Sequence, residues 1–309
     1  MNLNEDNPSA GRENFNNGEK AHIFIFISCN TILMLIIYSL LLRQNVESNP
    51  GPQNSFKIVT YNCNGLGDRS KLRRVLHKAE PIIKNGGFVF LQETHLKDIG
   101  YLKIVWKYGF VSNCKSSNSA GVLTLYNNNF KVLEQHEDAE GRQMVTVVGQ
   151  EGSKYILTNA YFPNDHKASI EFTKNLYNKT LESQGAYPEA ITIMAGDLNT
   201  CLGLKDSLNR LKSKNEIILS ENILSNNRVL QLADAYRSLH SEGGFTWNRG
   251  KIYSRLDYIF VPEYTVRNIL RADLDWAFDK SDHAAVVISI RTNEETMCGP
   301  GPTKVNTKC

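Results

Sequence analysis

Carboxylates, amides and one late histidine follow short apolar runs at several places in this sequence. In chain order they are Asn62 and Asn64, Glu93, Asp197 and Asn199, Asp257, and Asp282 with His283. Oxygen ligands without cysteine suit Mg²⁺ or Mn²⁺ better than zinc. A hard cation, a carboxylate that aligns water and a histidine that neutralises a phosphoryl oxygen together make a phosphodiesterase site. These residue types therefore predict metal-dependent hydrolysis of phosphodiesters.

Each motif alone has an ordinary structural interpretation. The Gly-Asp-x-Asn sequence at 196–199 is a common turn, because Asp and Asn side chains bind neighbouring backbone groups. Asn62 and Asn64 fit a turn before a helix, Glu93 fits a helix N-terminus, and Asp282-His283 fits a surface pair. The structural interpretation is the better one for any single motif, so a function must rest on the motifs in combination.

Short apolar runs and longer amphipathic stretches alternate from residue 56 to residue 290 and would position these side chains. The runs predict buried strands at 56–61, 88–92, 121–126, 143–148, 155–161, 190–195, 252–261 and 284–290. The longer stretches predict helices at 69–84, 169–183 and 221–239. The polar residues stand at strand ends, which is where sheet proteins place their functional sites.

Composition excludes some classes of protein and leaves others open. The chain is 41% hydrophobic and 22% charged, as expected of a globular protein. Its net charge of +3 is too small to indicate nucleic acid by itself, so a case for DNA must rest on local patches and motifs. The six cysteines are scattered without a CxxC pair, which argues against a zinc site or a disulfide framework and favours free thiols in a reducing compartment.

The order of the motifs is more specific than any one of them. Asn-x-Asn-Gly, Gln-Glu-Thr, Tyr-x-Pro-Asn, Gly-Asp-x-Asn, Arg-x-Asp-Tyr and Ser-Asp-His follow one another along the chain. In this order they resemble the endonuclease/exonuclease/phosphatase superfamily. The sequences at 92–95 and 281–284 look most like its exonuclease III branch and the apurinic-like endonucleases of LINE-type (non-LTR) retrotransposons. The resemblance implies an α+β, DNase I-like fold over residues 54–291, a four-layer α/β/β/α sandwich of two mixed β-sheets flanked by helices.

The resemblance also implies a role for each motif residue. On the metal side, Glu93 is implied as the principal ligand of Mg²⁺ or Mn²⁺, with Asn62 and Asn64 beside it and Asp282 in support. Many members of the superfamily have Asp where Asn64 stands, so the second metal contact is expected to be weaker here.

On the catalytic side, the resemblance implies that Asp197 orients or deprotonates the attacking water, and that Asn199 holds Asp197 and the phosphate. Tyr161 would contact the scissile phosphate or its leaving oxygen. His283 would stabilise the pentacovalent transition state, oriented by Asp257. Whether His283 acts as an acid, a base or a charged clamp stays open.

The same core hydrolyses DNA, phosphoinositides and sphingomyelin in different proteins, so the fold does not choose the substrate. Two basic stretches favour DNA. One is the helix after the first motif, with Arg69, Lys71, Arg73, Arg74 and Lys78; the other follows the Gly-Asp-x-Asn motif, with Lys205, Arg210, Lys212 and Lys214. An ordinary solvated face explains the basic helix equally well.

A predicted hairpin at 245–253 with a cationic tip is the third feature that favours DNA. In LINE endonucleases the similar hairpin enters the minor groove and helps to select the nick site. We therefore expect Trp247, Arg249 and Lys251 to contact DNA, together with Asn164 near the scissile phosphate. The alternative is that Trp247 and Tyr253 are core residues on half-buried strands.

The N-terminal residues predict a separate leader. Residues 1–20 are rich in Asn, Glu and Gly and predict disorder. A helix over the apolar residues 21–42 would reach about 32 Å, enough to span a bilayer. The octet at 45–52, Asn-Val-Glu-Ser-Asn-Pro-Gly-Pro, then resembles the 2A-type ribosome-skipping signal, with Asn45 where that pattern has Asp. Skipping would release a nuclease that begins at Pro52, in the nucleus or cytoplasm. The alternative is a linker after a membrane anchor.

The sequence thus predicts a monomeric, Mg²⁺-dependent DNA endonuclease that nicks target DNA for retrotransposon insertion, followed by a loose tail at 292–309. One alternative is a phospholipid or phosphoinositide phosphodiesterase of the same fold, tethered to a membrane through residues 21–42. Another is an inactive remnant that only binds nucleic acid. Against it stands the retention of Glu93, Asp197, Asn199, Asp257, Asp282 and His283. A reverse transcriptase does not follow within these 309 residues, so the chain is either a fragment or an endonuclease-only product.

Overall fold

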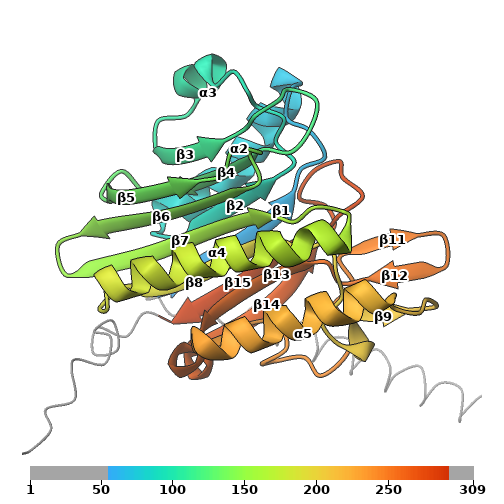
Figure 1. Ribbon diagram of the computed structural model, residues 1–309. Coiled ribbons are helices and arrows are strands. Elements are labelled where there is room, and N and C mark those ends of the chain that lie inside the picture. The colour runs from blue at the N-terminus through green and yellow to red at the C-terminus, as the bar shows by residue number, and fades with distance from the viewer. Residues whose placement is uncertain (1–54, 292–309) are drawn as a thin grey trace, which may run out of the picture. The chain divides into compact units, whose positions relative to one another are not determined.

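A computed structural model describes residues 55–291, in which two six-stranded sheets lie between outer helices (Figure 1). Across the first sheet the strands are β14 (Ile269–Asp275), β15 (Ala285–Arg291), β1 (Ser55–Asn62), β2 (Phe88–Gln92), β4 (Val122–Tyr126) and β3 (Gly109–Asn113). Across the second they are β10 (Leu232–Asp234), β13 (Asp257–Pro262), β8 (Ile191–Asp197), β7 (Ser153–Tyr161), β6 (Gln143–Gln150) and β5 (Lys131–Glu137). Both sheets are mixed, since β1 pairs with β2 and β7 with β8 in parallel, while the other pairs are antiparallel.

Three apolar cores hold the layers together. Successive side chains of a strand point to opposite faces, so Ile58 of β1 joins the core between the sheets while Val59 joins the core beneath the outer helices. The core between the sheets includes the neighbouring rings of Phe88 and Tyr155, whose centroids are 4.9 Å apart. A third core lies between the second sheet and its own helices.

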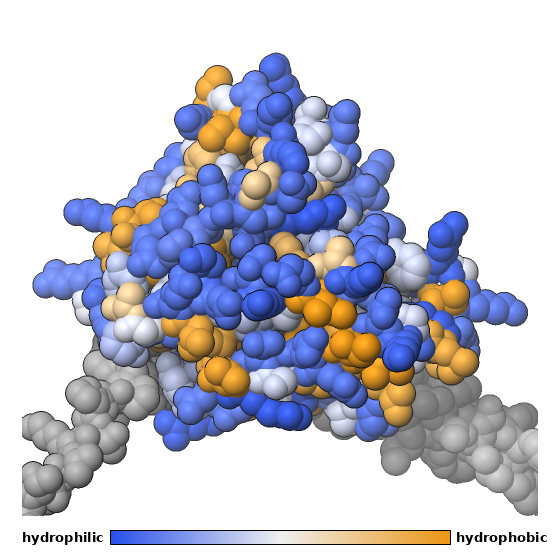
Figure 2. Space-filling view, viewed as in Figure 1, coloured by the Kyte–Doolittle hydropathy of each residue, from blue (hydrophilic) through white to orange (hydrophobic). Residues whose placement is uncertain are grey.

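The three longer helices begin at side-chain caps that the sequence supplies. α2 (Arg69–Lys84) begins after Asp68, whose carboxylate accepts hydrogen bonds from two backbone N–H groups of the first turn. α2 and the short α3 (Gly100–Val105) cover the first sheet. α4 (His166–Ala186) and α5 (Lys214–Val229) begin after Asp165 and Ser213 and cover the second sheet. Figure 2 shows their mostly hydrophilic outer face, with apolar residues gathered over α5, where Ile217, Leu224 and Val229 are exposed.

A small third sheet extends beyond the sandwich at one end (Figure 1). It consists of β11 (Trp247–Arg249), β12 (Ile252–Ser254) and β9 (Ser207–Leu208). Two 3₁₀ helices complete the elements, η1 (Leu204–Asp206) and η2 (Glu263–Asn268). The hairpin of β11 and β12 confirms the expected hairpin, with its tip exposed to solvent.

The structure confirms the four-layer α/β/β/α prediction and corrects two of its elements. The predicted strand 252–261 is two strands in different sheets, β12 and β13. They are separated at Arg255, whose side chain belongs to a buried ion-pair network. The predicted helix 221–239 is α5, which begins earlier and ends at Val229; Gln231 then has a positive φ of 54°, and β10 follows. The strands β3, β5, β9, β10 and β14 were not predicted.

None of the helices between residues 55 and 291 is long and apolar enough to cross a membrane. The predicted leader 1–20, the apolar segment 21–42, the octet 45–52 and the tail 292–309 all lie outside the described residues.

Candidate active site

The strands β1 and β2 end side by side and carry the first two motifs. They run parallel with Asn62 as the register partner of Gln92, and the N–H of Gly65 donates to the carbonyl oxygen of Glu93 over 2.7 Å. Asn64 and Glu93 have positive φ angles of 47° and 48°. Such angles are uncommon outside glycine and persist where the surrounding structure holds a strained backbone. The two turns therefore form one tightly connected unit.

Asp197 ends β8 and connects the second sheet to the first. Nδ2 of Asn62 donates to its Oδ2 over 2.9 Å, and the backbone N–H of Asn199 donates to its Oδ1 over 2.8 Å. Asp197 is only 1% exposed. Gly196 precedes it because a Cβ there would lie 1.9 Å from the carbonyl oxygen of Ala160, so only glycine lets β7 and β8 approach this closely.

Asp257 and His283 complete a buried acid–base group beside Asp197. Asp257 is the register partner of Asp197 in the pairing of β13 with β8. Nδ1 of His283 donates to Oδ2 of Asp257 over 2.7 Å, and Nε2 of His283 lies 4.0 Å from Oδ2 of Asp197. The Ser281 hydroxyl holds this turn in place, because it donates to the carbonyl oxygen of Asn62 over 2.8 Å and accepts from the N–H of His283.

The charges of this group perturb one another. Burial and the neighbouring Asp257 carboxylate raise the pKa of Asp197, against the lowering effect of His283. Burial alone would lower the pKa of His283, but the Asp257 carboxylate outweighs it and raises that pKa to about 10. Perturbed and mutually dependent pKa values of this kind are typical of acid–base catalysts. His283 is therefore charged at neutral pH and held beside two carboxylates.

Asp197, Asp257 and His283 have ligand atoms within 4.8 Å of one another, a spacing that would also fit a metal ion. Their hydrogen bonds argue for an acid–base role instead. Nδ1 of His283 is already bonded to Asp257, and Oδ2 of Asp197 accepts from Asn62. The raised pKa of His283 also keeps a proton on Nε2, so its imidazole has no lone pair to offer a cation.

Of the residues predicted to hold the metal, Asn62 ends β1, Asn64 and Glu93 lie in the turns after β1 and β2, and Asp282 lies before β15. The Tyr161 hydroxyl donates to the Glu93 carboxylate. Burial and the charge of Glu93 raise the pKa of Tyr161, so its hydroxyl stays protonated and remains a donor. Nδ2 of Asn64 donates to Oδ1 of Asp282 over 3.2 Å. The structure thus brings Glu93 into contact with Tyr161, and Asn64 into contact with Asp282.

The chemistry of these side chains fits a hard divalent cation. Carboxylate and amide oxygens are what Glu93, Asp282 and Asn62 offer, and such ligands suit Mg²⁺ or Mn²⁺. The nearby Cys63 does not compete, because burial raises the pKa of its thiol and keeps it neutral. The donor set therefore agrees with the cation expected from sequence.

The residues expected to bind DNA divide into two groups. Arg249 and Lys251 are exposed at the hairpin tip and Asn164 is exposed before α4, so all three are open to a large ligand. Trp247 differs, because it is half-buried and its indole N–H donates to Oδ2 of Asp282 over 3.1 Å.

Part of the predicted basic surface is occupied by internal contacts. Arg210 forms an ion pair with the buried Glu216, and Lys212 donates to the carbonyl oxygen of Leu202. In the structure these two cations hold the fold together, and a contact of either with DNA stays a prediction. Lys71 of the basic helix donates to the carbonyl oxygen of Asn64, so it supports the first motif.

Sequence reasoning missed two supports of the site. The Arg142 guanidinium lies 4.7 Å from the centre of the Tyr161 ring and donates to the carbonyl oxygen of Tyr161, yet no motif surrounds it. The Thr246 hydroxyl accepts hydrogen bonds from the N–H groups of Leu256 and Asp257. In the sequence, the only indication of this role was that Thr246 precedes Trp247 at the start of the expected hairpin.

Comparison with known proteins decides the family. Residues 59–283 match the model of the Endonuclease/Exonuclease/phosphatase family. The chain belongs to this family. Family membership places it among nucleases and phosphatases, enzymes that hydrolyse phosphate esters, and confirms the superfamily predicted from the six motifs. No sequence among the curated proteins matches the chain.

Solved structures of the endonuclease/exonuclease/phosphatase fold are similar over most of the chain. The AP endonuclease LMAP of Leishmania major superposes with a TM-score of 0.65 at 18% identity, covering 79% of this chain and 90% of that one. A variant of the 3′ phosphatase NExo of Neisseria, bound to a product DNA hairpin, gives 0.62 at 20% identity, covering 77% and 100%. The endonuclease domain of TRAS1, a telomere-specific non-LTR retrotransposon, gives 0.53 at 15% identity, covering 77% and 98%. These likenesses show the fold.

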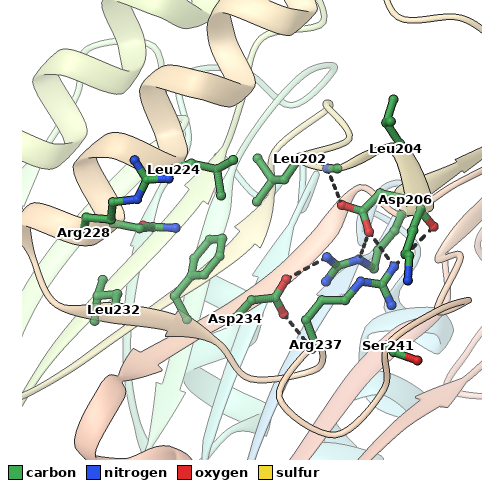
Figure 3. Close-up of a pocket in the computed structure, with 14 residues that line it drawn as sticks. Leu202, Leu204, Asp206, Leu224, Arg228, Leu232, Asp234, Arg237 and Ser241 are labelled. Atoms are coloured by element: carbon green, nitrogen blue, oxygen red, sulfur yellow. Dashed lines mark hydrogen bonds and ion pairs between the residues drawn. The ribbon is translucent and has the colours of Figure 1, made fainter.

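A separate cavity of about 530 Å³ lies between α5, β10 and the loop at 202–206 (Figure 3). Among the described residues, its lining includes none of the candidate catalytic or metal residues. One wall is an ion-pair network, in which Asp206 pairs with Arg237 and Arg255, and Arg255 also pairs with Asp234 over 2.7 Å. Because these four side chains pair with one another across the wall, we interpret it as a structural support for β13.

Proposed function

We propose that the chain is a Mg²⁺- or Mn²⁺-dependent endonuclease that nicks DNA, of the kind that non-LTR retrotransposons use to open their target. The observation that carries this proposal is the hydrogen-bonded connection from Asn62 to Asp197, with the Asp257–His283 pair beside it. It joins the ends of both sheets into one site that contains a carboxylate base and a charged histidine.

The side chains divide the chemistry between them. Asp197 accepts the proton of the attacking water, since its raised pKa makes it a stronger base than an ordinary aspartate. Nε2 of His283 donates to a phosphoryl oxygen and stabilises the charge that develops there. The 4.0 Å between Nε2 and Asp197 is too long for a direct hydrogen bond, which leaves both groups available to a ligand placed between them.

The remaining motif residues hold the substrate and the cation. A bound Mg²⁺ would stabilise charge on the scissile phosphate from the Glu93 side, with Asn62, Asn64 and Asp282 around it. Tyr161 keeps Glu93 oriented through its hydroxyl and contacts the phosphate or its leaving oxygen.

DNA is the substrate that the exposed cations favour. The hairpin tip carries Arg249 and Lys251 away from the sandwich, where they would reach the backbone of a duplex bound across the site. Two of the similar structures carry names that support this choice, a phosphatase bound to a DNA hairpin and a retrotransposon endonuclease.

We propose a monomeric enzyme of the nucleus or cytoplasm once it is released at Pro52, and a membrane-anchored one if residues 21–42 are retained.

Nicking of supercoiled plasmid by the purified protein, with Mg²⁺ and with EDTA, tests the proposal. Release of phosphate-containing headgroups from phosphoinositide and sphingomyelin vesicles, measured in parallel, tests the lipid alternative. We expect Mg²⁺-dependent conversion of supercoiled to open-circular plasmid and no lipid hydrolysis. Lipid hydrolysis without nicking would favour the membrane-tethered enzyme, and DNA binding without either reaction would favour the inactive remnant.

A further inference from the structure

Asp282 is held from two directions by neutral N–H donors. Nδ2 of Asn64 donates to its Oδ1 over 3.2 Å, and the indole N–H of Trp247 donates to its Oδ2 over 3.1 Å. Asn64 belongs to the turn after β1, whereas Trp247 begins β11 of the hairpin. A carboxylate with one donor on each oxygen has its plane fixed, and one of the two donors comes from the element expected to touch DNA.

The base of the hairpin is also fastened to the catalytic strands through the backbone. Trp247 forms a β-bridge with His283, and the N–H of Ala284 donates to the carbonyl oxygen of Thr246 over 2.8 Å. The Thr246 hydroxyl accepts from the N–H of Asp257 over 3.2 Å. At the tip, by contrast, the side chains of Arg249 and Lys251 are exposed to solvent. The hairpin therefore has an exposed tip and a base built into the active site.

We propose that Trp247 is a positioning residue that couples the hairpin to the metal side of the site by orienting Asp282. When DNA holds the tip, Trp247 is held with it, and Asp282 keeps the orientation that a cation needs. Coupling of this kind is reciprocal, so the cation tightens DNA binding by the same factor. Trp247 thus has a role different from a base contact, and it plays this role only if the proposed metal-dependent nuclease activity holds.

The three tryptophans of the chain offer a direct measurement on the unaltered protein. In an ¹H–¹⁵N spectrum of the indole groups, Mg²⁺ should shift the resonance of Trp247 and leave that of the exposed Trp276 in place. Trp247→Phe identifies the resonance by its loss and removes the donor while keeping an apolar ring. Trp276→Phe is the matched control.

Direct titration of Mn²⁺ without DNA should show about 10- to 100-fold weaker binding in Trp247→Phe, the usual effect of losing a partner that orients a metal-binding carboxylate. In an Asp282→Asn background the same substitution should have no further effect, because both changes act through one contact.

The nick map of Trp247→Phe should match that of the parent. The coupling is overturned if the parent protein binds Mg²⁺ and nicks DNA while the Trp247 resonance does not move. It is also overturned if Trp247→Phe shifts the nick map and leaves the Mn²⁺ affinity unchanged. Absence of cation binding and nicking in the parent overturns the proposed function instead.

Discussion

Oδ2 of Asp257 lies 2.7 Å from Nδ1 of His283, and both side chains are buried. The Asp257 carboxylate raises the pKa of His283 to about 10. It also raises the pKa of Asp197, and burial of Asp197 acts in the same direction. Asp257 therefore controls both the proposed base and the proposed charged donor.

Asp257→Asn should move both limbs of the pH–rate profile to lower pH. Hydrolysis needs Asp197 unprotonated and His283 protonated, so the rate rises with pH through the first pKa and falls through the second. Removing the Asp257 charge lowers both pKa values, although the maximum rate falls as well. Plasmid nicking measured across the pH range checks this, and limbs that stay in place would contradict the assigned roles.

Asp197→Asn and His283→Ala should each lower the nicking rate by on the order of 10² to 10³, because each removes a contact made in the transition state. Circular dichroism and the melting temperature should show that both variants remain folded. Near-parental turnover in either purified variant would exclude that residue from the chemistry.

Arg249→Ala combined with Lys251→Ala should change where the enzyme nicks more than how fast it nicks a generic substrate. Both cations are exposed at the hairpin tip, away from the buried acid–base group. Sequenced nick maps of variant and parent provide the measurement. Lys57→Ala with Lys131→Ala, two exposed cations on β1 and β5, is the control, and coincident maps for all three proteins would make the hairpin purely structural.

The strands that carry the site were predictable because their signals are local. β1, β2 and β8 are short apolar runs that end at polar residues, and Gly196 marks the close approach of β7 and β8 within a recognisable motif. The order of such motifs then indicated the fold, since each one follows its own strand.

The failures share a different cause, since each depends on contacts far apart in the chain. Arg255 interrupts an apolar run because its partners Asp206 and Asp234 lie in other elements. The bond from the indole N–H of Trp247 to Asp282 could not be predicted either, because the two residues lie 35 positions apart in the chain. A local pattern gives the type of a side chain and its periodicity, but its partner is set by the tertiary fold.

Arg255→Met should destabilise the protein by about 3–5 kcal/mol, because it leaves the buried carboxylate of Asp206 and that of Asp234 without their shared partner. Arg255 is 2% exposed and lies 2.8 Å from Asp206. Arg271→Met is the matched control: its exposed pair with Asp273, at 3.8 Å, is expected to contribute at most about 1 kcal/mol. Urea unfolding of the three proteins gives both values, and equal losses would argue against a structural role for the Arg255 network.

Translation of the chain should release some nuclease that begins at Pro52, separate from the apolar residues 21–42. The octet at 45–52 resembles a ribosome-skipping signal, and β1 begins shortly after it at Ser55, so a product starting at Pro52 would lose no strand of the sandwich. Asn45 departs from the pattern, so separation should be partial; Asn45→Asp should increase it and Pro52→Ala should abolish it. In vitro translation with a reporter placed ahead of residue 21 distinguishes one product from two. A single full-length band that Asn45→Asp leaves unchanged would favour the anchored enzyme, whose substrate would then have to be reached from a membrane surface.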